Sequence, residues 1–159
     1  MAEYPVFLQQ IVVDVCQTML GFKLCDNDPV DSIPELSAAV EFHGAHGMVL
    51  EVFANLNLAT RFASTMFSTE PHNLNREDIC DALGEVANMI GGNLRGFLGE
   101  EVDLSLPTVG ESSATTWKRM SADVVMTFLC DGLPLMVVLR DPTSEYSASE
   151  LTVSSPETL

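Results

Sequence analysis

Two polar residues near the middle of the chain have types and a spacing that suit chemistry. Glu85 and Asn88 are three positions apart, and Asp81 comes one helical turn before Glu85. On a helix this spacing places a carboxylate beside a carboxamide. The carboxylate can bind a cation, and the neutral carboxamide can orient a water molecule without a proton transfer. A solvated face, on which Glu85 pairs with an arginine of its own chain, would give the same pattern.

The helix that must position these residues is predicted from about Arg76 to Leu98. Asn75 is its expected N-cap, Asp78 reaches back in a variant of the capping box, and Gly99 ends the helix. Helical periodicity assigns five residues to the core side: Leu83, Val86, Ile90, Leu94 and Phe97. The opposite side receives Asp81, Glu85, Asn88, Gly92 and Arg95.

Four glycines inside this helix are unusual, because each costs roughly 1 kcal/mol relative to alanine. They are Gly84, Gly91, Gly92 and Gly96, and the periodicity places none of them on the apolar stripe. Glycines in these positions allow another surface to approach the backbone. That surface belongs either to a partner or to a neighbouring short helix of the same chain.

The order of these residues resembles a known family. Asp81-x-x-x-Glu85-x-x-Asn88, within Asp-Ala-Leu-Gly-Glu-Val-Ala-Asn-Met-Ile-Gly-Gly-Asn, is similar to the signature helix of the CheX, CheC and FliY chemotaxis phosphatases. Pro107 matches the proline that closes their motif, and the resemblance covers about residues 5–140. CheC-like members carry a second acid and amide pair on the first helix. This chain has only Asp14 and Gln17 there, which favours the single-site CheX-like type.

The resemblance implies a phosphatase that accelerates hydrolysis of the aspartyl phosphate on a CheY-like response regulator. The resemblance further implies that Glu85 binds the active-site lysine of the receiver domain and that Asn88 positions the attacking water. Asp81, Gly84, Gly92 and Pro107 would support docking. The receiver would supply Mg²⁺, so no cofactor or metal site of the chain's own is expected, and the resemblance also implies a homodimer joined along sheet edges.

Two other functions remain open from the sequence. The chain could be a non-catalytic module that binds receiver domains, or a structural subunit like those of the flagellar switch. Loss of phosphate release in an Asn88→Ala variant would distinguish the enzyme from the binding module.

The remaining sequence predicts an α+β fold, with a mostly antiparallel sheet packed against two long helices and one short helix. The first long helix should span Pro5 to Gly21 and the short helix Leu58 to Phe67, and Cys25 to Pro34 should form a loop. Strands are expected at Leu36–Phe42, Met48–Leu56, Val102–Leu106, Ala122–Cys130 and Leu133–Leu139. A turn at Asp131 and Gly132 should join the last two strands.

Composition limits the surroundings and the partners. A chain of 159 residues with 47% hydrophobic content suits one domain, predicted at residues 1–140, and residues 141–159 form an acidic Ser/Thr-rich segment expected to be flexible. The net charge of −16 disfavours nucleic acid and anionic membranes as partners. Without an apolar stretch long enough to span a bilayer, or a basic N-terminal start, the chain is expected in the cytoplasm.

Cysteine and histidine give no sign of a metal site. The four cysteines are scattered without a Cys-x-x-Cys pair, so we expect free thiols, most of them in or near the core. His43 and His46 share a predicted turn, but no carboxylate or cysteine pair accompanies them, and surface positions are the commoner outcome.

Overall fold

A computed structural model describes residues 4–26, 34–44, 47–99, 101–112 and 124–141. Within these ranges the helical segments are α1 (Tyr4–Val13), a π-helix (Asp14–Met19), α2 (Leu56–Phe67), a 3₁₀ turn (Pro71–Asn73) and α3 (Arg76–Leu98). The strands are β1 (Leu24–Asp26), β2 (Leu36–His43), β3 (Met48–Ala54), β4 (Asp103–Leu104), β5 (Thr108–Glu111), β6 (Val124–Cys130) and β7 (Leu133–Arg140). The predicted segment 141–159 lies outside the described residues except for Asp141.

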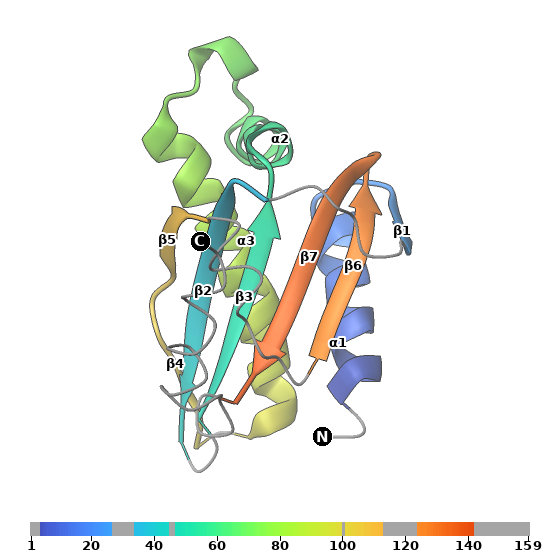
Figure 1. Cartoon of the computed structure of the whole chain (residues 1–159), viewed down its shortest axis with the longest axis vertical. Coiled ribbons are helices and arrows are strands. Elements are labelled where there is room, and N and C mark those ends of the chain that lie inside the picture. Colours follow the sequence, from blue (N-terminus) through green and yellow to red (C-terminus); the bar gives the residue numbers. More distant parts are fainter. Residues whose placement is uncertain (1–3, 27–33, 45–46, 100, 113–123, 142–159) are drawn as a thin grey trace, which may run out of the picture.

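The strands form one antiparallel sheet in the order β1-β6-β7-β3-β2-β4, and β5 also pairs with β2. Two hairpins meet at its centre, where β3 pairs with β7 from Val49 opposite Arg140 to Ala54 opposite Leu135. Asp131 and Gly132, at φ 49° and 82°, make the predicted tight turn between β6 and β7. In Figure 1, β4 and β5 lie along one edge of the sheet and β1 at the other.

Helices α1 and α3 cover one face of the sheet, and α2 packs against α3 near one end of it (Figure 1). Buried and less buried residues alternate along β2, as expected where one face of a sheet packs on a core. The central strands β3 and β7 are buried at most positions, and Phe53, Met136 and Val138 form a second, smaller cluster. The main core lies between the sheet and the helices. From β2 and β3 it receives Leu36, Ala38, Val40, Phe42, Leu50 and Val52. The α+β class and the antiparallel sheet are therefore as the sequence predicts.

The helix lengths differ from the expectation of two long helices. Only α3, with 23 residues, is long among the helices in the described ranges. The predicted N-terminal helix is 10 residues of α-helix followed by six residues in π-helical geometry, and it stops before Gly21, whose φ is +76°. The α2 helix has 12 residues.

Candidate functional site

The long helix α3 is a rigid support for Glu85 and Asn88. The side chain of Asn75 accepts a hydrogen bond from the Asp78 backbone N–H at 2.8 Å, and the Asp78 carboxylate accepts one from the Asn75 N–H at 3.2 Å. This reciprocal capping box and the bounds of the helix are as predicted. Nine of its residues are buried, from Ile79 to Leu94, so tertiary packing fixes the turns that carry the candidate site.

The candidate site residues face outward from this support. Asp81 and Glu85 are exposed and Asn88 is half-buried. Among the described residues, none of the three side chains has a hydrogen-bond or ion-pair partner in the chain, and the Asn88 amide is not a buried unpaired group, so solvent reaches it. The arginine pairing that the sequence left open for Glu85 is therefore not made within the described ranges. The Glu85 carboxylate and the Asn88 amide are therefore available to an external partner.

Gly84 permits a close approach by the chain's own Pro107 and Val109. A Cβ at Gly84 would lie 3.0 Å from Val109 Cγ2 and 3.4 Å from Pro107 Cγ. Gly84 is buried as a result, which corrects the expectation that all four glycines lie off the buried side of the helix. The surface that approaches it is neither a partner nor a short helix, but the segment that enters β5.

Gly91, two turns further along α3, also lets other parts of the chain approach the helix closely. A Cβ there would lie 2.9 Å from Val40 Cγ2 and 3.3 Å from Leu104 Cδ1. The chain from Leu104 to Val109 therefore runs alongside α3, with Leu104 next to Gly91 and Pro107 next to Gly84. Asn88 is four residues after Gly84 and three before Gly91, so it lies on the same face of the helix as both contacts. Glu85 lies about 100° around the helix from Gly84. Asn88 is accordingly less exposed than Glu85.

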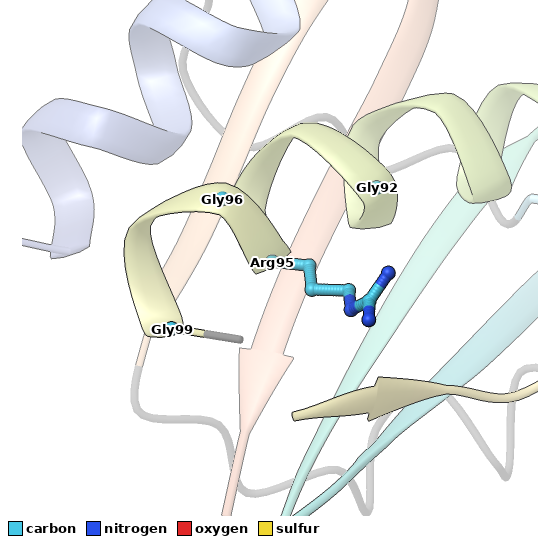
Figure 2. A pocket seen from close by; sticks show the side chains of 4 residues that line it. All are labelled: Gly92, Arg95, Gly96 and Gly99. Carbon is cyan, nitrogen blue, oxygen red and sulfur yellow. The ribbon is translucent and has the colours of Figure 1, made fainter. Parts of the chain in front are cut away.

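The two remaining glycines face open space. A Cβ at Gly92 or at Gly96 would meet no atom of the described residues within 4 Å. Together with Arg95 and Gly99 they line a hollow of about 290 Å³ on the exposed side of the last turns of α3. Figure 2 shows the Arg95 side chain extending away from the helix, while the glycines leave its surface bare. The Arg95 Nε–H donates to the Val102 carbonyl, which fixes the base of the guanidinium group.

Phe97 is the one predicted core residue of this helix that is not buried. It is 57% exposed and stacks on Phe7 of α1, with ring centroids 4.6 Å apart. The prediction fails because Phe97 faces α1, where its ring stacks on Phe7 and stays largely open to solvent.

The first helix does not present a second free acid and amide pair. Gln10 Nε2 donates to Asp14 Oδ1 at 2.9 Å, and Gln17 Nε2 donates to the Leu24 carbonyl at 3.2 Å. Both candidate groups are thus engaged within the chain. This agrees with a single candidate site on α3.

The histidine turn is only partly described. His43 is exposed and lies 3.6 Å from a carboxylate oxygen of Glu41, whereas His46 falls outside the described residues. In the described ranges no three His, Cys, Asp or Glu side chains gather as they would around a metal ion. In the same ranges, no helix is both long enough and apolar enough to cross a membrane.

Sequence reasoning missed Leu106, which is 87% exposed directly before Pro107. A signal for it was present in Leu-Ser-Leu-Pro. The residue before a proline is held in extended conformation. The side chains of Leu104 and Pro107 on either side of it both contact glycines of α3, whereas Leu106 stays exposed. The sequence could not show which side faces solvent.

The family described as "Chemotaxis phosphatase CheX" matches residues 36–130. No curated protein matches the sequence.

Similar solved structures include the chemotaxis protein CheX of Vibrio vulnificus, with a TM-score of 0.70 and 20% identity over 87% of this chain and 95% of that one. CheX of Desulfovibrio desulfuricans has a TM-score of 0.67 and 21% identity, over 86% of this chain and 97% of the other. The CheX of a CheX-CheY-BeF3-Mg complex from Borrelia burgdorferi has a TM-score of 0.69 and 19% identity, over 86% and 96%. At these identities the likeness establishes a shared fold.

Proposed function

This chain belongs to the CheX family of chemotaxis phosphatases, and on that premise we propose that it accelerates hydrolysis of the aspartyl phosphate on a CheY-like receiver domain. The similar CheX of Borrelia burgdorferi forms a complex with CheY, BeF3 and Mg, which supports a receiver as the partner here. The observation that carries the proposal is a carboxylate and a carboxamide without partners among the described residues, three positions apart on a capped, buried helix.

Asn88 would position the attacking water. An aspartyl phosphate is a reactive acyl phosphate, and in-line attack by water on phosphorus breaks the bond to the aspartate oxygen, releasing phosphate and a free carboxylate. The reaction depends mainly on positioning and charge stabilisation, so a partner that holds water in line accelerates it. A neutral carboxamide suits this task because it does not repel the anionic phosphoryl group.

Glu85 would bind the lysine of the receiver's active site. Glu85 is exposed and no cation of the described chain lies beside it, so its carboxylate can accept a charge-assisted hydrogen bond from an incoming ammonium. The ion pair strengthens as docking excludes water. The receiver is also the expected source of Mg²⁺, which would neutralise the phosphoryl oxygens.

The other predicted site residues divide into two roles under this proposal. Asp81 and Gly92 lie on the exposed face on either side of Glu85 and Asn88, where they would border the docked receiver. Gly84 and Pro107 pack against each other inside the chain, so they would act as positioning residues for the segment beside Asn88.

The homodimer is also a proposal, and the sheet suggests where it would form. β1 ends the sheet opposite β4 and β5, which flank the candidate site. Pairing through the β1 edge would leave Glu85 and Asn88 free for receivers. Size-exclusion chromatography with light scattering tests this, and a monomeric mass would rule it out.

The function is tested by phosphate release from a phosphorylated CheY-like receiver, with the chain at substoichiometric concentration. Wild type should release phosphate over many turnovers, and Asn88→Ala should lose most of the acceleration. Asn93→Ala is the matched control, because Asn93 is exposed on the same helix and donates to the Met89 carbonyl of its own chain. Equal release by wild type and Asn88→Ala would instead support the binding-module alternative.

A further inference from the structure

We propose that Leu106 is an apolar anchor for the docked receiver, placed beside the polar pair of α3. The inference rests on the proposed function, since it names a second contact of the same docking surface. Its expected partner is an apolar patch on the receiver next to the phosphorylated aspartate. Leu106 would contribute to affinity rather than to the chemical step.

The exposure of Leu106 is the first observation. At 87% it is the most exposed of the six large apolar side chains that lie open to solvent in the described part of the chain. A single exposed leucine on a loosely held loop would need no explanation. The case therefore depends on how the backbone around Leu106 is held.

Both neighbours of Leu106 are fixed to different elements. The Ser105 backbone N–H donates to the Glu41 carbonyl at 2.9 Å, and the Ser105 hydroxyl accepts from the Glu41 N–H at 2.9 Å. On the other side, Pro107 packs against Gly84 of α3. Leu106 is thus presented from a segment attached to β2 and to α3 at once, which lowers the entropy lost when it is buried in a complex.

The position of Leu106 relative to the site follows from the same contacts. Leu104 touches Gly91 and Pro107 touches Gly84, so this segment passes the stretch of α3 that carries Glu85 and Asn88. Gly84 and Gly91 are seven residues apart, or about 10 Å along a helix. The backbone at Leu106 therefore lies beside the stretch of α3 that carries both polar side chains, and the proposal is that one receiver contacts all three.

The proposed docking surface would then make three kinds of contact with the receiver. Glu85 offers a negative charge, Asn88 a neutral hydrogen-bonding group, and Leu106 an apolar side chain. Interfaces concentrate their binding energy in a few central residues, and an apolar group next to a charge pair excludes water from that pair. Under the proposal, Leu106 is the apolar part of the docking surface, held in place before the receiver binds.

The test is steady-state phosphatase kinetics, together with direct binding to a receiver carrying beryllofluoride and Mg²⁺ as a stable phosphoryl mimic. Leu106→Ala should raise KM and Kd about tenfold, the size expected for truncating an interface anchor, with kcat within about twofold of wild type. Leu106→Met should restore most of the affinity because it keeps the apolar volume.

Val125→Ala is the matched control. Val125 is 55% exposed on β6, and it alternates with Val124, which faces the core beneath the helices, so it projects from the opposite face of the sheet. An unchanged KM and Kd in Leu106→Ala, or an equal change in Val125→Ala, would overturn the anchor. If wild type releases no phosphate but Leu106→Ala still weakens binding, the catalytic proposal fails and the anchor stands.

Discussion

Gly84 of α3 and Pro107, ahead of β5, are packed so closely that a Cβ on the glycine would lie 3.4 Å from the Pro107 Cγ. This contact joins the helix that carries Glu85 and Asn88 to the segment that carries Leu106. Under the proposed function, the motif proline that the sequence indicated would set the distance between these two parts of the docking surface.

Gly84→Ala should disturb activity more than stability. The new Cβ would gain about 1 kcal/mol of helix propensity but would meet Val109 Cγ2 at 3.0 Å, and relieving that crowding costs a similar amount. The free energy of unfolding should change by no more than about 1 kcal/mol in thermal melts, while kcat/KM for the receiver falls several-fold because the segment beside Asn88 is displaced. Full activity in this variant would show that the Gly84 and Pro107 contact does not position the site.

The neighbouring glycines Gly91 and Gly92 should respond to alanine with opposite signs. At Gly91 the Cβ would lie 2.9 Å from Val40 in the core, and overpacking should destabilise the protein by about 1 kcal/mol net. At Gly92 it would meet no described atom, so the propensity gain should stabilise the protein by about 0.5–1 kcal/mol. Urea unfolding curves of both variants measure this, and equal shifts would contradict the packing described.

Glu85→Gln should weaken docking through the loss of one charge. Removing one partner of a desolvated ion pair costs about 2 kcal/mol, so kcat/KM should fall roughly 30-fold. The salt dependence of kcat/KM should also become shallower, because an attractive charge pair is lost. Glu70→Gln serves as the control, since Glu70 is exposed in the turn before α3. A salt dependence as steep as that of wild type would argue against the lysine contact.

The four thiols should differ in how fast iodoacetamide alkylates them, with two accessible thiols and two protected ones. A hydrogen bond with Cys16, together with burial, raises the pKa of the Cys130 thiol, and both residues are buried. Exposed Cys25 should react first and half-buried Cys80 more slowly, while Cys16 and Cys130 stay unmodified until the protein unfolds. Mass spectrometry of samples taken over time at about pH 8 measures this order, and early labelling of Cys130 would contradict it.

The same pKa shift predicts how stability depends on pH. Below the ordinary thiol pKa of 9.0, Cys130 is neutral in the folded and the unfolded chain. Above it the unfolded chain ionises while the folded thiol stays protonated, so the free energy of unfolding should fall as pH rises past about 9. Denaturant midpoints measured about one pH unit below and one above that value test the direction.

Local signals in the sequence account for the parts of the fold that were predicted correctly. The bounds of α3 follow from the capping box of Asn75 and Asp78 and from Gly99, which adopts a φ of 109°. The turn at Asp131 and Gly132 likewise encodes the β6–β7 hairpin. Each of these depends on residues within a few positions of one another, which is why the sequence alone was sufficient.

Features that depend on distant contacts were missed. β1 lies partly in a predicted loop and becomes a strand because Leu24–Asp26 pairs with Phe128–Cys130. β5 was not predicted, because its four residues are ordered by pairing with β2 and by packing on Gly84. The predicted strand Val102–Leu106 shortens to Asp103–Leu104, since Pro107 interrupts the pairing with β2.

In the candidate site, too, the features set by local sequence were predictable and those set by distant contacts were not. Spacing on α3 was enough to place Asp81 and Glu85 outward with Asn88 beside them, because helical geometry is local. The sequence could not show that Gly84 and Gly91 receive the chain's own segment while Gly92 faces the open hollow. That difference depends on where residues 104–109 cross the helix, which is a property of the tertiary fold.

The most direct test of the central claim is the single-turnover rate constant for dephosphorylation of the receiver at saturating chain concentration, compared between wild type and Asn88→Ala. If Asn88 positions the attacking water, this rate constant falls at least about 100-fold, while the Kd for the beryllofluoride-activated receiver changes less than about threefold. A saturating rate constant equal to that of wild type would contradict the claim.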